Sequence, residues 1–265
     1  MSGAQARPPS SREIGRPSGR QSSAVRWPLP ALDAALRGRL VVSCQPVAGG
    51  PLDDDAVVLR MAQAAVAGGA AALRIEGARR LAAVRALLDV PLIGIVKREL
   101  PDSPVRITPW LDDVRALAAA GADVVAVDAT SRPRPCTVKA LCEAIQAEGC
   151  VAMADVATEA DGLAAWADGF SIIGSTLSGY TGGPVVQQPD LVLVARWAAA
   201  GCRVMAEGRY HTPALAAAAL RAGAWAVTVG SAITRLEVVT GWFVEALHQS
   251  SPRENDEIGP VDGLT

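Results

Sequence analysis

Four polar residues that could contribute to a reactive site each follow a short apolar run. They stand 52, 58 and 52 residues apart and are Gln45, Lys97, Asp155 and Glu207. An ammonium at the end of an apolar run loses hydration, which lowers its pKa and lets it act as a base, an acid or a Schiff-base nucleophile. Lys97 is one of only two lysines, and with Glu207 it could place a proton acceptor and a proton donor around one carbon. A structural ion pair between the two is the alternative.

A second set of polar or small residues ends the apolar runs that lie between these four. They are Arg74, Asp128, Thr176 and Gly230. The guanidinium of Arg74 is a planar fork of donors that suits a carboxylate, a phosphate or a carbonyl oxygen, whereas the Gln45 amide can bind a hydroxyl or an amide. Asp128 and Asp155 could each orient a substrate hydroxyl, or form a structural salt bridge with Lys97 or Arg74.

Two glycine turns near the end of this pattern have the composition of a phosphate site. Gly208 precedes a helix that begins near Thr212, and Gly230-Ser231 leads from an apolar run directly into another helix. Glycine lets the backbone approach an anion, and a helix N-terminus directs free N–H groups towards it. We therefore predict that these turns bind a phosphate with the help of Arg235. A tight turn that simply needs glycine is the alternative.

Bringing these residues together requires eight strands with helices between them. The predicted strands cover residues 40–43, 70–74, 91–96, 123–127, 150–154, 171–174, 203–206 and 226–229. Continuous apolar strands indicate a parallel sheet buried on both faces, and eight such units in about 210 residues favour a closed (β/α)8 barrel, a TIM barrel, with its active site at the carboxyl ends of the strands. An open doubly wound sheet is the alternative, but no Gly-x-Gly-x-x-Gly motif follows the first strand.

Composition argues against several classes of protein. The 265 residues are 50% hydrophobic and 20% charged, with a formal net charge of −2, which is typical of a globular protein. No apolar run reaches the roughly 20 residues that cross a bilayer, and the arginines form no basic stripe, so we expect neither a membrane nor a nucleic-acid partner. Five cysteines without a Cys-x-x-Cys pair predict reduced thiols, a cytoplasmic location and no zinc site. We expect no metal and no cofactor.

The two ends of the chain differ in composition from the middle. Residues 1–28 are rich in Ser, Gly, Pro and Arg and lack the apolar core of a signal peptide, so we predict a disordered extension. A weak electrostatic tether to an acidic partner is the alternative. Residues 250–265 are polar and predict a tail. The expected domain is thus one barrel over residues 29–249.

Nine short motifs follow one another along the chain at the spacing of a barrel. They are Val42-Ser-Cys-Gln45, Leu73-Arg74, Ile93-Gly-Ile-Val-Lys-Arg98, Ser103-Pro-Val-Arg-Ile-Thr-Pro109, Val127-Asp-Ala-Thr130 with Arg132-Pro-Arg-Pro135, Met153-Ala-Asp155, Thr176-Leu-Ser-Gly-Tyr-Thr181, Ala206-Glu-Gly-Arg209 and Gly230-Ser-Ala-Ile-Thr-Arg235. Together they resemble the N-acetylmannosamine-6-phosphate 2-epimerases of sialic acid degradation. The resemblance covers nearly the whole barrel.

The resemblance implies an isomerase, an N-acylglucosamine-6-phosphate 2-epimerase, that works without a cofactor. It implies that Lys97 and Glu207 are the acid–base residues. The candidate substrate-binding residues are Gln45, Arg74, Asp128, Asp155, Thr176, Ser178 and Arg209, and the candidate phosphate-binding residues are Gly208, Gly230, Ser231 and Arg235. The sequence departs from the family pattern at four places: Glu99-Leu100, His211, Ser231 and Leu236. A homodimer is the expected assembly.

The implied reaction interconverts N-acetylmannosamine 6-phosphate and N-acetylglucosamine 6-phosphate through the proton at C2. That proton is acidic only beside a carbonyl, so ring opening should precede its removal, and the enolate oxygen needs a donor such as Arg74 or Lys97. One residue could serve both proton transfers, or two could serve opposite faces. A Schiff-base sugar-phosphate aldolase or lyase, and a non-catalytic sugar-phosphate-binding barrel, are the alternative functions.

Overall fold

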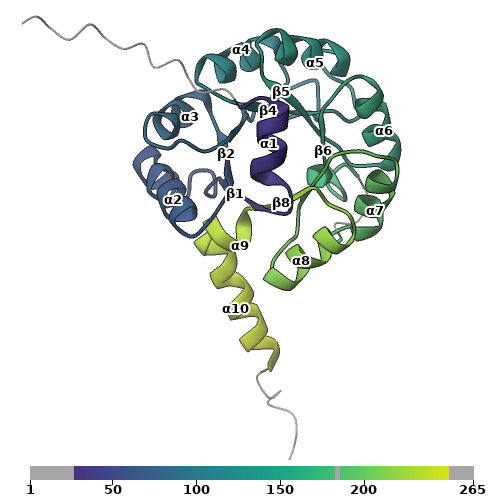
Figure 1. The fold of residues 1–265 in the computed structure, drawn as a ribbon. Helices are drawn as coiled ribbons and strands as arrows, with labels where there is room; N and C mark the ends of the chain where they lie inside the picture. The colour runs from purple at the N-terminus through teal and green to yellow at the C-terminus, as the bar shows by residue number, and fades with distance from the viewer. Residues whose placement is uncertain (1–26, 183–185, 251–265) are drawn as a thin grey trace, which may run out of the picture.

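Eight parallel strands form a closed barrel in a computed structural model that describes residues 27–182 and 186–250 (Figure 1). The strands are β1 Leu40–Cys44, β2 Ala72–Glu76, β3 Leu92–Ile95, β4 Val124–Asp128, β5 Val151–Asp155, β6 Ile172–Gly174, β7 Val204–Glu207 and β8 Ala226–Val229. They pair in sequence order, and β8 closes onto β1. The predicted (β/α)8 barrel is confirmed, and this closure rules out the open sheet.

Helices surround the barrel and connect successive strands (Figure 1). They are α2 Asp55–Ala67, α3 Ala78–Arg85, α4 Leu111–Ala119, α5 Val138–Ala147, α6 Glu159–Ala167, α7 Leu191–Ala199 and α8 Pro213–Arg221, and a 3-10 turn, η1 Ser175–Leu177, follows β6. Side-chain oxygens of Asp54, Thr158 and Thr212 accept backbone N–H groups at the starts of α2, α6 and α8. These caps stabilise the helix ends that follow the strands.

Strand alternation directs the polar residues into the barrel. Ile95, Met153 and Met205 belong to the apolar cluster inside the barrel. Because alternate side chains of a strand face the same side, the residues two positions further on also face inward. These residues are Lys97, Asp155 and Glu207. A second, larger cluster fills the space between the strands and the surrounding helices.

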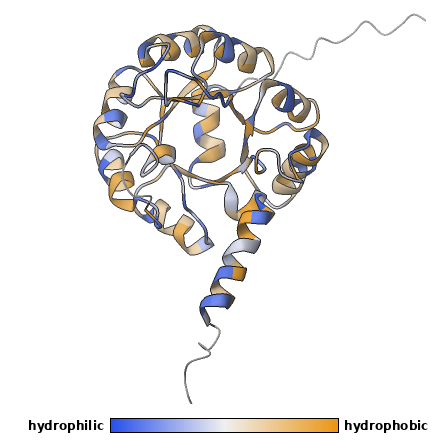
Figure 2. Ribbon diagram, turned by 180° about the vertical axis from the view of Figure 1, so that it is seen from behind, coloured by the Kyte–Doolittle hydropathy of each residue, from blue (hydrophilic) through white to orange (hydrophobic). Residues whose placement is uncertain are grey.

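A short helix closes the amino-terminal mouth of the barrel. In Figure 1, α1 Leu29–Leu36 lies across this opening, and Figure 2 shows hydrophobic residues on it. Leu32 and Leu36 are completely buried in the inner cluster. Asp33 accepts a hydrogen bond from the Trp225 indole N–H at 2.8 Å, which ties the helix to β8. The polar residues therefore lie at the opposite mouth.

The chain leaves the barrel after β8. The short helix α9 Ser231–Thr234 is followed by α10 Leu236–Ser250, which points away from the barrel (Figure 1) and has no buried residue. The last part of the predicted 29–249 barrel domain is thus a projecting helix. The predicted extension and tail lie almost entirely outside the described residues. None of the helices in the described ranges is both long and apolar enough to span a membrane.

Candidate active site

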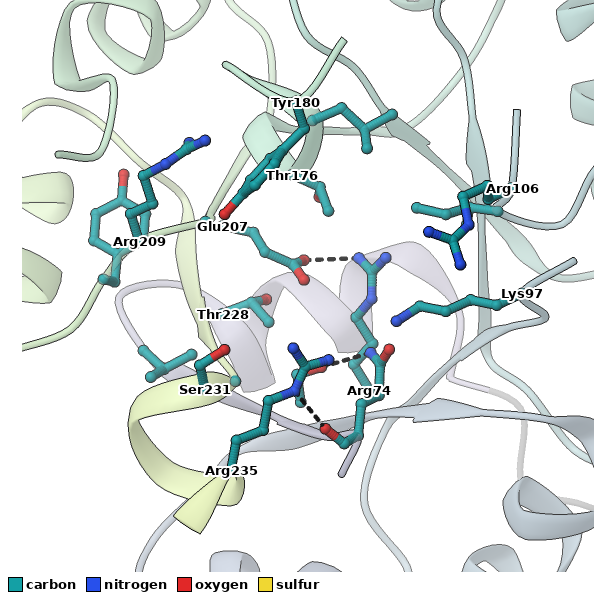
Figure 3. Close-up of a pocket in the computed structure, with 18 of the residues that line it drawn as sticks. Arg74, Lys97, Arg106, Thr176, Tyr180, Glu207, Arg209, Thr228, Ser231 and Arg235 are labelled. Carbon is teal, nitrogen blue, oxygen red and sulfur yellow. Dashed lines mark hydrogen bonds and ion pairs between the residues drawn. The ribbon is translucent and has the colours of Figure 1, made fainter. Parts of the chain in front are cut away.

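A cavity of about 430 Å³ opens at the carboxyl-terminal mouth of the barrel (Figure 3). Eleven of the thirteen predicted site residues line it: Gln45, Arg74, Lys97, Asp128, Thr176, Glu207, Gly208, Arg209, Gly230, Ser231 and Arg235. They come from the ends of seven strands and the loops that follow them. The volume is in the range of small-molecule sites, and the wall is rich in charged groups that could bind an anion.

Arg74 lies on the floor of the cavity, where its guanidinium pairs with two carboxylates. Its side chain is only 1% exposed and forms ion pairs with Asp155 at 2.6 Å and with Glu207 at 2.7 Å. Two carboxylates compensate the cost of burying the guanidinium. The Arg74 Nε–H has no partner among the described residues. Arg74 therefore holds Glu207 in place and keeps one donor free.

Asp155 forms the salt bridge with Arg74 that the sequence left open, and it lies beneath the cavity wall. The side chain is completely buried, and its oxygens accept hydrogen bonds from the Arg74 guanidinium and, at 2.6 Å, from the Thr176 hydroxyl. Both of its oxygens are thus already engaged by protein groups. In this structure Asp155 supports Arg74 and Thr176 and does not face a ligand.

Of the two predicted substrate-binding residues that follow β6 and β7, Arg209 lines the cavity and Ser178 does not. Ser178 is buried outside the cavity wall, with its hydroxyl towards Asp190, the cap of α7. Arg209 lines the cavity, but its guanidinium donates to the Ser178 carbonyl at 2.6 Å and stacks over the Tyr180 ring at 3.9 Å. Arg209 therefore holds the loop after β6, and Tyr180 forms part of the wall.

Asp128 takes the salt-bridge role that the sequence left open, although with a different partner. Its carboxylate pairs with Arg132 at 2.5 Å and accepts hydrogen bonds from the backbone and hydroxyl of Thr130. Asp128 is only 1% exposed. Its contacts fix the loop after β4 at the edge of the cavity.

Lys97 extends into the cavity from the end of β3 (Figure 3). Glu207 pairs with Arg74, and Lys97 forms no ion pair with any residue of the described ranges, so the structural Lys97–Glu207 pair is absent there. The side chain stays accessible from the open cavity. Partial loss of hydration, followed by repulsion from Arg235 and Arg74, lowers the pKa of Lys97 to about 8. A fraction of the amine is therefore neutral and basic near neutral pH.

Glu207 approaches the same cavity from β7. Burial is the main cause that raises its pKa to about 7, and repulsion from Asp155 adds to it, while Arg74 and Lys97 act in the opposite direction. In a barrel with the strand order β1 to β8, β3 and β7 lie on opposite sides. Lys97 and Glu207 therefore reach the cavity from opposite directions, and both have a pKa suited to proton transfer near neutral pH.

The glycine turns lie where β7 and β8 end. Gly208 has a φ of 102°, a conformation that favours glycine, and a Cβ at Gly230 would lie 3.3 Å from the Cβ of Ser43. The backbone N–H groups at the start of α9 have no partners within the helix, because they belong to its first turn. Arg235 donates to the Gln45 carbonyl at 2.9 Å while its guanidinium faces the cavity (Figure 3).

Several wall residues were missed by sequence reasoning. They are Ser43, Arg106, Tyr180, His211 and Thr228. The strand alternation was a usable signal for Ser43 and Thr228, since they stand two positions before Gln45 and Gly230. Arg106 and Tyr180 lie within two of the family motifs, but strand alternation marks neither them nor His211, because all three come to the cavity from loops. The His211 ring lies 4.4 Å from the Trp242 ring of α10, which links this wall to the projecting helix.

The fold and the site together define a (β/α)8-barrel protein in which a lysine, a glutamate and two glycine turns meet in one cavity at one mouth. Comparison with known families then gives a narrower assignment. Residues 58–249 match the NanE family, described as "Putative N-acetylmannosamine-6-phosphate epimerase". The chain belongs to this family.

Individual relatives agree with this assignment. The chain is 60% identical over 215 residues to the "Putative N-acetylmannosamine-6-phosphate 2-epimerase" of Proteus mirabilis (strain HI4320), a match that covers 81% of this chain and 93% of the relative. It is 56% identical to the protein of the same name from Klebsiella pneumoniae (strain ATCC 700721 / MGH 78578), over 86% and 99% of the two chains. A solved structure of the N-acetylmannosamine-6-phosphate 2-epimerase from Clostridium perfringens matches with a TM-score of 0.79 at 37% identity, over 81% and 96%.

Proposed function

We propose that this chain is an isomerase that interconverts N-acetylmannosamine 6-phosphate and N-acetylglucosamine 6-phosphate in the degradation of amino sugars such as sialic acid. The observation that carries the proposal is one cavity that Lys97, without an ion pair among the described residues, and the ion-paired Glu207 reach from opposite sides of the barrel. The names of the relatives supply the substrate. Incubation with N-acetylmannosamine 6-phosphate should yield its C2 epimer by proton NMR, and unchanged substrate would overturn the proposal.

The proposed mechanism moves one proton at C2 of the open-chain aldehyde. A neutral Lys97 amine removes it, and the Arg74 guanidinium stabilises the negative charge that develops on the enolate oxygen. Inversion requires a proton to return to the opposite face of the planar enolate. Glu207, on the strand opposite Lys97, is placed to serve that face. The reaction is redox-neutral, so it consumes no electron acceptor.

The phosphate is proposed to bind at the glycine turns, with Arg235 as its charged partner. Replacing Arg235 with alanine should raise KM by about 10- to 100-fold, since a hydrogen bond to a charged group contributes about 1.5–3 kcal/mol. We expect kcat to change little, because Arg235 lies away from the reacting carbon. Steady-state kinetics measure both constants. Arg115→Ala on α4, an exposed residue paired with Asp112, is the matched control.

A fall in kcat with an unchanged KM for Arg235→Ala would contradict the phosphate assignment. Circular dichroism of the variant should match the parent protein, because the hydrogen bond from Arg235 to the Gln45 carbonyl is one of many contacts at this mouth.

The assembly is proposed to be a homodimer formed through α10. Leu236, Phe243 and Leu247 follow one another by seven and four residues, so they share one face of the helix. Each of these side chains is 65–69% exposed, and no residue of α10 is buried, so the barrel leaves this face of the helix uncovered. A second copy offers the same face, and closed two-fold dimers are the commonest protein oligomers.

Light scattering should therefore give a mass of twice the 27.3 kDa chain for the parent protein. The double variant Phe243→Glu with Leu247→Glu should give the mass of one chain, because it places charges in the apolar contact. Glu245→Gln on the same helix is the control and should stay dimeric. A parent protein with the mass of one chain would contradict the dimer.

The cytoplasm is the proposed location. None of the five cysteines, Cys44, Cys136, Cys142, Cys150 and Cys202, forms a disulfide. Five cysteines without a disulfide are typical of a reducing compartment.

A further inference from the structure

Thr228 on β8 has a buried hydroxyl that no residue in the described part of the chain satisfies. The residue is 1% exposed, lines the cavity, and its Oγ1 has no hydrogen-bond partner among the described residues. Ala226, two positions earlier, belongs to the cluster inside the barrel, so strand alternation directs Thr228 inward as well. Figure 3 shows its side chain on the cavity floor between Glu207 and Ser231. Since a buried, unpaired hydroxyl is destabilising, a ligand group is the natural partner.

The neighbours of Thr228 are already engaged. The Ser43 hydroxyl, on the adjoining strand β1, accepts a hydrogen bond from the Gln45 amide at 2.6 Å. On the other side, Glu207 lies opposite Thr228 in the pairing of β7 with β8 and is bound to Arg74. Unlike these two neighbours, the Thr228 hydroxyl has neither a donor nor an acceptor partner among the described residues.

The position of Thr228 along the cavity indicates which atom of the substrate its hydroxyl would contact. Gly230, at the proposed phosphate turn, is two residues further along the chain, about 6.6 Å away at the rise of a parallel strand. Glu207, at the proposed reacting carbon, is its strand partner. Thr228 thus lies between C2 and the phosphate on C6. The sugar oxygen next to C6 is the one on C5.

On the basis of the proposed function, we propose that Thr228 is a specificity-determining residue that binds the C5 oxygen of the substrate in both its ring and its open-chain form. In the pyranose this oxygen is an ether and only accepts a hydrogen bond. Ring opening breaks the C1–O5 bond, turns the O1 hydroxyl into the aldehyde and transfers its proton to O5, which then also donates. A threonine hydroxyl both donates and accepts, so it can hold this oxygen throughout, whereas an ammonium only donates and a carboxylate only accepts.

The test compares Thr228→Val with Thr228→Ser on two substrates. Valine has the shape of threonine without the hydroxyl, and serine keeps the hydroxyl. One substrate is N-acetylmannosamine 6-phosphate, and the other is its 5-deoxy analogue, which lacks the C5 oxygen and cannot form the pyranose ring. With the first, Thr228→Val should lower kcat/KM by about tenfold or more, and Thr228→Ser should retain most of it. With the 5-deoxy analogue, Thr228→Val and the parent protein should be equal.

Other results of this comparison would each contradict one part of the proposal. An equal loss on both substrates would overturn the assignment to the C5 oxygen. No loss on either substrate would overturn any binding role for Thr228. A parent protein that does not epimerise N-acetylmannosamine 6-phosphate would overturn the proposed function itself. The thermal unfolding midpoint of both variants should stay close to that of the parent protein, which separates a binding defect from a folding defect.

Discussion

Replacing Lys97 with methionine should remove nearly all epimerase turnover while the protein keeps its fold and its affinity for N-acetylmannosamine 6-phosphate. Lys97 forms no ion pair with the described residues, so its loss leaves no carboxylate without its partner. Methionine retains an unbranched apolar chain of similar length. Positioned acid–base catalysis is worth about 10²–10⁴-fold, and we expect a fall in kcat of this size. Product formation followed by proton NMR measures the rate, and calorimetry measures substrate affinity.

Lys139→Met is the matched control for this variant. Lys139 is the second lysine of the chain, exposed on α5 and 3.7 Å from Glu143. It should leave kcat unchanged. A Lys97→Met protein that binds substrate and turns it over at the parent rate would show that another group removes the C2 proton.

Replacing Glu207 with glutamine should also reduce kcat by about 10²–10⁴-fold, because the amide cannot exchange a proton with the substrate. Glutamine keeps the shape of the side chain and an oxygen that can accept the hydrogen bond from Arg74. Asp155 continues to compensate the buried guanidinium. The fold and ligand affinity should therefore survive. Glu159→Gln, an exposed residue paired with Arg196, is the control.

Solvent exchange separates the roles of the two residues. If they serve opposite faces, a variant that lacks one of them still exchanges the C2 proton of one epimer with solvent but does not form the other epimer. If Glu207→Gln epimerises as fast as the parent protein, its assignment to proton transfer is wrong. Loss of exchange from both epimers in Lys97→Met alone would assign both transfers to Lys97.

Much of the barrel was predictable because its signals are local. Each strand is a short apolar run, and all eight predicted strands form, with ends that differ by no more than two residues. β2 begins at Ala72 and not at Ala70, because the Ala70 N–H still bonds to Ala65 in the preceding helix end. Strand alternation also explains why the polar residue after each run, such as Lys97 or Glu207, faces the cavity.

What the sequence did not predict depends on partners distant along the chain. The ion pair between Arg74 and Glu207 joins β2 to β7, five strands further along the chain, and no local sequence pattern specifies this pair. The burial of Asp155 follows from Arg74 and Thr176, which complete its hydrogen bonds from two other strands. Ser178 turns out of the cavity because its loop is held by Arg209. Spacing identified the strand ends but not which side chains pair there.

The positions of the two terminal helices, α1 and α10, also could not be predicted from local sequence patterns. No helix is predicted before the first strand, because no local pattern shows that Leu32 and Leu36 are buried in the amino-terminal mouth of the barrel. The α10 helix has the composition of an ordinary barrel helix, yet it projects from the barrel. In the proposed homodimer a second chain covers the apolar face of α10, and a single sequence does not display such a contact.

Epimerisation requires that the proton at C2 of the phosphorylated amino sugar is removed and replaced. The most direct measurement is incubation of the parent protein with N-acetylmannosamine 6-phosphate in D₂O, followed by proton NMR. We predict that N-acetylglucosamine 6-phosphate accumulates with deuterium at C2, and that the C2 proton signal of the remaining substrate fades as the reaction reverses. Cleavage of the carbon chain would indicate an aldolase or lyase. Unchanged substrate with its C2 proton intact would contradict the proposed epimerase reaction.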